Sequence, residues 1–163
     1  MQQHGSVLAY LGHTDFPSHM YSSGFYYREL YFDSVEKFIM FSKSKLFHDE
    51  ATAQLILNAE NGYQCKELGK RVVGFNQEIW DQWSPKVALV GNREKYKQNP
   101  GLAQLLVQTH PLILAEASWN KRWGAGYGKD DPRLGNMAQW PGQNLGGNTV
   151  MVVRTELMNG TLR

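Results

Sequence analysis

An acid and an amine lie seven residues apart in residues 33–45. If this stretch is helical, Glu36 and Lys43 return to one face after nearly two turns, about 10 Å apart along the helix axis. Ile39 and Met40 lie between them on that face and are typical of a surface that packs into the interior. Burial there would perturb the pKa values of both groups, as acid–base or nucleophilic catalysis requires.

The same residues also have an ordinary structural interpretation. Asp33 or Ser34 is a good helix N-cap, and Glu36, three residues after Asp33, fits a capping box and suits the positive end of a helix. Lys43 could be a solvated surface lysine. The pattern alone therefore leaves two alternatives open, a capped surface helix and a catalytic pair.

Length and composition favour a soluble globular protein. The 163 residues fit one domain, residues 1–163, with a substantial core. A net charge of +2 does not by itself indicate a nucleic-acid or membrane partner. Aromatic residues make up 12% of the chain, which is more ring surface than a core of this size needs, so some rings could serve a planar ligand.

The cysteine count and the hydropathy of the chain bear on disulfides, metal sites and cellular location. Cys65 is the single cysteine, so no internal disulfide can form, and no Cys and His pattern indicates a metal site. We therefore expect no metal and no cofactor, and a cytoplasmic location, or a nuclear one in a eukaryote. No apolar run is long enough to cross a bilayer, and the first residues do not resemble a leader peptide. We expect a monomer without a membrane partner.

Periodicity predicts a mainly α fold with a small β element near the N-terminus. The Pro85 position predicts a break near Ser84 and a new helical start. Strands are expected within residues 7–11, 25–32 and 112–117, and helices at 33–45, 49–59, 63–69, from the cap Asn76 to 97, at 102–108 and at 148–158.

Residues 118–147 are rich in Gly, Trp, Asn and Asp, and so long a loop in a compact domain is usually functional. Glycine amides, or the start of the last helix, could hold an anion there. An irregular packed coil is the alternative. The Gly124 and Gly126 pair is not a dinucleotide fingerprint, because no G-x-G-x-x-G follows a strand.

Taken together, ordered motifs along the chain resemble the NADAR (YbiA-like) family. Any one motif is weak, but their common order and spacing from about residue 16 to residue 154 are specific. The motifs are Phe16–Tyr21, Ser34-Val35-Glu36 with Lys43, Gly69–Val72, Trp80, Lys95-Tyr96 with Gln98-Asn99-Pro100, Glu116-Ala117-Ser118, Trp123–Gly126, Asp131-Pro132, and Trp140 with Gly142–Leu145.

The resemblance implies a single, mainly helical YbiA-like domain that hydrolyses a ribose-to-nitrogen bond. Characterised members of the family are N-glycosidases. Some cleave early phosphorylated intermediates of riboflavin biosynthesis, and others remove ADP-ribose from guanine in DNA. We expect the second substrate, so that the partner is the ADP-ribose moiety of a ribosylated base on DNA. The riboflavin intermediates and a non-catalytic ADP-ribose or nucleotide binder stay open as alternatives.

In the family, the motif glutamate and the lysine seven residues later are associated with catalysis, which implies roles for Glu36 and Lys43. A neutral Lys43 amine could attack the ribose C1 and form a Schiff base, with Glu36 moving protons. In a second scheme Glu36 activates water and Lys43 holds the ribose hydroxyls. Burial would lower the Lys43 pKa and ionised Glu36 would raise it, and the sequence does not decide the balance.

Motif matching also implies substrate-binding positions. Trp123, Trp140 and Trp80 could stack on a base, although a helical Trp80 could equally be core. Gly124, Gly126 and Asn144 could contact pyrophosphate or ribose. The remaining candidates are Asp131, which could orient ribose hydroxyls or cap the loop, Arg71 and Lys95, which are possible phosphate partners or surface charges, and Ser18, Tyr21 and Ser34.

The chain departs from the family pattern at several positions. Lys37 and Met40 replace a His and a Gln that often follow the motif glutamate, His19 replaces an Asn, and residues 146–148 replace Leu-Gly-Lys. Because Glu36 and Lys43 are kept, these changes bear on substrate choice more than on reaction type.

Overall fold

The computed structural model describes residues 1–162, in which six α-helices, five short strands and two 3-10 turns form. The mainly α fold with N-terminal strands is confirmed. The chain divides into two compact units, His19–Asn99 and the combination of Met1–Ser18 with Pro100–Arg163. The expectation of one domain over residues 1–163 stays a prediction.

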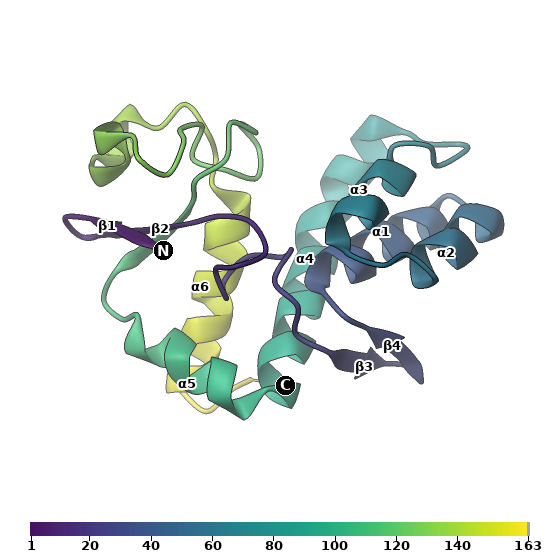
Figure 1. Cartoon of the computed structure of the whole chain (residues 1–163), viewed down its shortest axis with the longest axis horizontal. Coiled ribbons are helices and arrows are strands. Elements are labelled where there is room, and N and C mark those ends of the chain that lie inside the picture. The colour runs from purple at the N-terminus through teal and green to yellow at the C-terminus, as the bar shows by residue number, and fades with distance from the viewer. Residues whose placement is uncertain (163) are drawn as a thin grey trace. The chain divides into compact units, whose positions relative to one another are not determined.

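The unit of residues 19–99 holds a hairpin and four helices, labelled in Figure 1. Its elements are β3 (Phe25–Tyr27), β4 (Leu30–Phe32), α1 (Val35–Leu46), α2 (Glu50–Leu57), α3 (Gly62–Gly69) and α4 (Gln77–Gln98). Helix α1 packs against α2, α3 and α4 and is the centre of this unit. Phe38 of α1 meets the hairpin rings of Phe25 and Phe32 edge-on, with centroids 5.9 and 5.2 Å away.

Ser34 is the N-cap of α1. Its Oγ accepts from the Lys37 N–H at 3.3 Å, while the Asp33 carboxylate accepts from Lys37 Nζ at 2.6 Å. The Glu36 N–H donates to the His19 carbonyl at 2.9 Å. The predicted capping box between Asp33 and Glu36 is therefore wrong, and the Glu36 carboxylate is left for another role.

Helix α4 runs without a break through Pro85, which corrects the break predicted near Ser84. Asn76 is its N-cap, as predicted, with Oδ1 accepting from the Ile79 N–H at 3.0 Å. Proline in a helix interior costs about 3 kcal/mol. The buried face that includes Trp80, Ser84 and Ala88 offsets that cost by packing continuously.

The second unit is built on a three-stranded sheet. Strand β2 (Val7–Tyr10) pairs antiparallel with β1 (Gln2–His4), with Gln3 opposite Leu8, and parallel with β5 (Ile113–Glu116), with Ala9 opposite Ala115. Helix α6 (Leu145–Met158) packs on β5 and on α5 (Pro100–Gln108). No helix within residues 1–162 is both long and apolar enough to cross a membrane.

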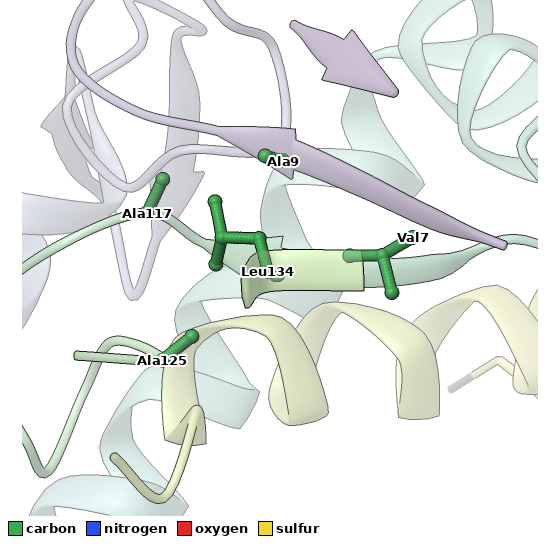
Figure 2. Close-up of a cluster of buried hydrophobic side chains, with 6 residues drawn as sticks. Val7, Ala9, Ala117, Ala125 and Leu134 are labelled. Carbon is green, nitrogen blue, oxygen red and sulfur yellow. The ribbon is translucent and has the colours of Figure 1, made fainter. Parts of the chain in front are cut away.

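The loop of residues 118–147 packs into this unit. It contains the 3-10 turns η1 (Pro132–Gly135) and η2 (Met137–Gln139). Figure 2 shows Leu134 of η1 and Ala125 of the loop gathered with Val7, Ala9 and Ala117 in one buried cluster. The loop therefore contributes side chains to the core, as the packed-coil alternative requires.

Candidate active site

Helix α1 carries Glu36 and Lys43 seven residues apart, and α3 lies against both. The Lys43 side chain is 9% exposed, and Glu36 is partly buried. Neither residue faces bulk solvent, which removes the surface-lysine interpretation of Lys43. The pair therefore has the surroundings that catalytic groups need.

Burial shifts the pKa values of the pair in opposite directions. Desolvation raises the pKa of Glu36 from 4.5 to about 7, against the lowering effect of the Lys66 and Lys43 charges. Desolvation also lowers the pKa of Lys43, against the raising effect of Glu36. Near neutral pH the acid can therefore hold a proton, and the amine loses its proton more readily than an exposed lysine does.

The Lys43 amine is held by three groups. Its Nζ donates to the Gly69 carbonyl oxygen at 2.7 Å, at the end of α3. The Phe75 ring centroid lies 4.0 Å from Nζ, and the Trp80 ring centroid lies 5.9 Å away. The amine is thus fixed in one place by one hydrogen bond and two aromatic faces.

Glycines allow α3 to approach this face of α1. A Cβ on Gly62 would lie 3.3 Å from the Glu36 Cβ and 2.8 Å from the Met20 Sδ. A Cβ on Gly69 would lie 2.2 Å from the Met40 Sδ, closer than atoms can approach. Both ends of α3 therefore touch the stripe of α1 that carries the acid and the amine.

An acid that titrates near neutrality and an amine with a lowered pKa can share two kinds of chemistry. The acid can pass a proton to a leaving group, and the amine can attack an electron-poor carbon. Within residues 1–162 no group of three or more His, Cys, Asp or Glu side chains is placed to hold a metal ion.

The other predicted site residues of this unit fall into different places. Trp80 is buried beside Lys43, Ser34 is the cap of α1, and Arg71 is exposed. Lys95 is 0% exposed, and desolvation lowers its pKa to about 7. Its Nζ lies 5.4 Å from the Tyr21 ring centroid. A phosphate could reach Lys95 only if the surrounding side chains moved.

The positions that depart from the family pattern have structural contacts. Lys37 Nζ donates to the Ala59 carbonyl oxygen at 2.8 Å in addition to Asp33. Met40 lies against Gly69. His19 is buried, with Nε2 and the Asn92 Nδ2 2.9 Å apart, and desolvation holds its pKa down at about 3. These substitutions therefore preserve the framework around Glu36.

In the other unit, Asn144 has a structural role. It is 2% exposed, its Oδ1 accepts from the Glu116 N–H at 2.9 Å, and its Nδ2 donates to the Leu114 carbonyl at 2.9 Å. The Gly124 and Gly126 amides already donate, to the Asn120 and Ser118 carbonyls at 2.8 and 2.9 Å. These groups bond within the protein in this structure, and their contact with substrate stays a prediction.

Two of the remaining candidates in this unit, Asp131 and Trp140, support the loop through hydrogen bonds. Asp131 caps η1 by accepting from the Arg133 N–H at 2.9 Å, which is one of its two predicted roles. Trp140 is half-buried, and its Nε1 donates to the Leu134 carbonyl at 3.0 Å. Trp123 is half-buried, and Ser18 is buried.

The start of α6 already has an acid beside it. A Cβ on Gly146 would lie 1.8 Å from Glu116 Oε2, so this carboxylate packs against the first turn. An anion predicted at that helix start would meet Glu116. The loop of residues 118–147 and the Glu36–Lys43 pair belong to different units, and a functional role of the loop stays a prediction.

The sequence interpretation missed Phe75, Gly62 and Lys66. A detectable signal was present, because Gly62, Lys66 and Gly69 repeat at four and three residues, as Glu36, Met40 and Lys43 do. Two such stripes on neighbouring helices are expected to face each other.

The fold is mainly helical, and one helix carries a partly buried acid and a buried amine. The model of the NADAR domain family matches residues 2–158, and the chain belongs to that family. The chain is similar to N-glycosidase R617 of Acanthamoeba polyphaga mimivirus, with 36% identity over 76% of this chain and 73% of that protein. It is also similar to protein irg-1 of Caenorhabditis elegans, with 34% identity over 78% of this chain and 62% of that protein.

A solved structure has the same fold. The NMR structure of the Escherichia coli protein YbiA matches with a TM-score of 0.76 and 20% identity, covering 100% of this chain and 90% of YbiA. At this identity the match establishes the architecture, and substrate and mechanism rest on other observations.

Proposed function

We propose that this protein is an N-glycosidase that hydrolyses the bond between ribose and a base, and that it removes ADP-ribose from guanine in ADP-ribosylated DNA. Lys43 is the Schiff-base nucleophile and Glu36 the acid and base. The observation that carries the proposal is the pairing on α1 of an acid whose pKa burial raises to about 7 with an amine whose pKa burial lowers.

The similarity to a protein named N-glycosidase supports the reaction type. The bond to be broken joins a sugar carbon to a base nitrogen, which leaves more readily once it accepts a proton. Protonated Glu36 supplies that proton at neutral pH. Neutral Lys43 supplies an electron pair to the ribose C1.

The steps balance without a further reactant. The Lys43 nitrogen bonds to C1 while the C1–base bond breaks, and the base nitrogen takes the proton of Glu36. The bond between C1 and the ring oxygen then breaks as a proton moves from the Lys43 nitrogen to that oxygen, which leaves the imine. Glu36, now a carboxylate, deprotonates water that adds to C1. Collapse of this adduct frees the Lys43 amine and the sugar.

Borohydride distinguishes this scheme from the one in which Glu36 activates water directly and Lys43 only holds hydroxyls. Reduction of the imine during turnover would fix the sugar on Lys43 as a mass increase of the tryptic peptide that contains it. An active enzyme that yields no adduct under these conditions would exclude the Schiff base and leave the direct scheme.

The substrate test is release of ADP-ribose from an oligonucleotide that a guanine-specific transferase has modified. We expect release by the wild type and loss of at least 100-fold in Glu36→Gln and Lys43→Ala. Lys45→Ala is the matched control, because Lys45 is an exposed lysine of the same helix that pairs with Glu50, and it should keep full activity.

Early phosphorylated riboflavin intermediates, assayed beside the oligonucleotide, test the alternative substrate. Cleavage of these intermediates with an inert oligonucleotide would reassign the substrate and keep the reaction type. Binding of ADP-ribose without turnover of any ribosylated base would show a non-catalytic binder and refute the proposal.

A further inference from the structure

Lys66 lies on the face of α3 that meets the Glu36–Lys43 stripe. Gly62 touches Glu36, and Gly69 touches Met40 and binds Lys43. Lys66 follows Gly62 by four residues and precedes Gly69 by three, so the three positions share one helix face. Lys66 therefore lies between the two ends of the candidate active site.

The charge of Lys66 reaches Glu36. Among the charges that act on the Glu36 carboxylate, Lys66 has a larger effect than Lys43. Lys66 is exposed, and its charge also acts on the adjacent acid, Glu67, whose carboxylate is bonded to Lys70 at 2.5 Å. An exposed cation whose neighbouring acid is already bonded to another lysine thus stands near the proposed acid.

The Lys66 cation, beside an acid that is partly protonated at neutral pH, leaves this face of α1 and α3 with an excess of positive charge. A ligand that carries a compact negative charge near the reacting ribose would complement it. Lysine binds phosphate as a point charge, and its long side chain lets an exposed amine follow a flexible group.

We propose that Lys66 binds the phosphate on O5 of the ribose whose C1 is attacked, so that the site selects 5′-phosphorylated ribosyl groups over plain ribosides. This inference rests on the proposed function, because Glu36 and Lys43 define where C1 lies. Lys66 holds the sugar while Lys43 and Glu36 act on it, and Lys66 takes no part in bond making. Either N-ribosyl substrate class, ADP-ribosyl or phosphoribosyl, presents this group.

The test compares a phosphorylated ribosyl substrate with its dephosphorylated form. In Lys66→Gln we expect kcat/KM to fall about 10- to 100-fold for the phosphorylated substrate, mainly through KM, and to change little for the other. Lys66→Arg should restore most of the preference for the phosphorylated substrate over the dephosphorylated one. Lys70→Gln removes a neighbouring exposed lysine that is already paired, and it should keep the preference.

A binding measurement tests the phosphate site independently of N-glycosidase activity. Calorimetry should show ribose 5-phosphate binding more tightly than ribose to the wild type, with the difference lost in Lys66→Gln. Binding that depends on Lys66 without any N-glycosidase activity would refute the proposed function and leave the phosphate site standing. Equal losses on both substrates, or equal binding of ribose 5-phosphate by Lys66→Gln and the wild type, would overturn the inference.

Discussion

The Nζ of Lys43 lies 4.0 Å from the centroid of the Phe75 ring. Phe75 is 40% exposed and packs edge-on against Phe47 at 5.4 Å, in the segment between α3 and α4. Gly74 precedes it with φ +72°, a conformation that side chains rarely adopt. The Phe75 ring therefore lies against the Lys43 amine while part of the ring stays exposed to solvent.

Replacing Phe75 by Leu should shift the pH dependence of activity. The ring face favours the charged amine by about 0.5–1 kcal/mol, so its loss lowers the pKa of Lys43 further. The activity of Phe75→Leu should then rise at a lower pH than that of the wild type. Phe75→Tyr keeps the ring and should keep the wild-type profile. A profile unchanged in Phe75→Leu would show that the ring does not act on the amine.

Glu36→Gln should make the protein more stable above neutral pH while abolishing activity. The pKa of Glu36 is raised from 4.5 to about 7 in the folded chain, so between these values the unfolded chain has lost a proton that the folded chain keeps. The contribution of Glu36 to stability is therefore fully present below pH 4.5 and is lost as pH rises through about 7. Gln removes this dependence, and Glu36 is partly exposed, so we expect a gain of about 2 kcal/mol at pH 8.

Urea unfolding at pH 4 and pH 8 measures this difference directly. Glu50→Gln, which alters an exposed acid paired with Lys45, is the control and should show little change between the two values. Equal stabilisation of Glu36→Gln at both pH values would contradict the raised pKa and the acid role built on it.

Local rules in the sequence predicted most of the unit of residues 19–99. Ser34 and Asn76 cap their helices because short polar side chains satisfy the first amides of a helix. Pro85 misled the prediction, because a local penalty was outweighed by packing along α4. The packing of Gly62 and Gly69 against α1 was not predicted, because the repeat on α3 marks a helix face and does not say which helix that face meets.

For residues 118–147, the sequence did not distinguish a binding loop from a packed one. Their Gly, Trp and Asn content is typical of a binding loop and of a loop that packs into its own unit, because both need close backbone approaches and ring surface. Trp140 and Asn144 bond to backbone carbonyls of their own unit. Composition does not distinguish the two, because the partner of each side chain is distant in sequence.

Asn144→Ala should therefore cost stability. It would leave the Glu116 N–H and the Leu114 carbonyl oxygen without their partner, at about 1–3 kcal/mol for a buried group, and it would place Ala at φ +52°. Asn144→Gly also lacks the two side-chain hydrogen bonds but relieves the backbone strain, so it should recover part of the cost. Denaturant unfolding measures both. A variant as stable as the wild type with a raised KM would instead support the predicted contact with substrate.

Gly69→Ala tests the contact that brings α3 to Lys43. The added Cβ would lie 2.2 Å from the Met40 Sδ and 3.1 Å from its Cγ, so Met40 must move or α3 must retreat. We expect a cost of about 1–2 kcal/mol. Activity should fall because the carbonyl of Gly69 that holds the Lys43 amine shifts with the helix end.

A double-mutant cycle with Met40→Ala separates the steric contact from a general effect of alanine. In the Met40→Ala background the added methyl group has space, so Gly69→Ala should cost at least 0.5 kcal/mol less than in the wild type. Gly101→Ala is the control, because no atom lies within 4 Å of a Cβ built there, and it should be neutral or stabilise α5 by about 0.5–1 kcal/mol. Additive costs in the cycle would show that Gly69 and Met40 do not set the distance between α1 and α3.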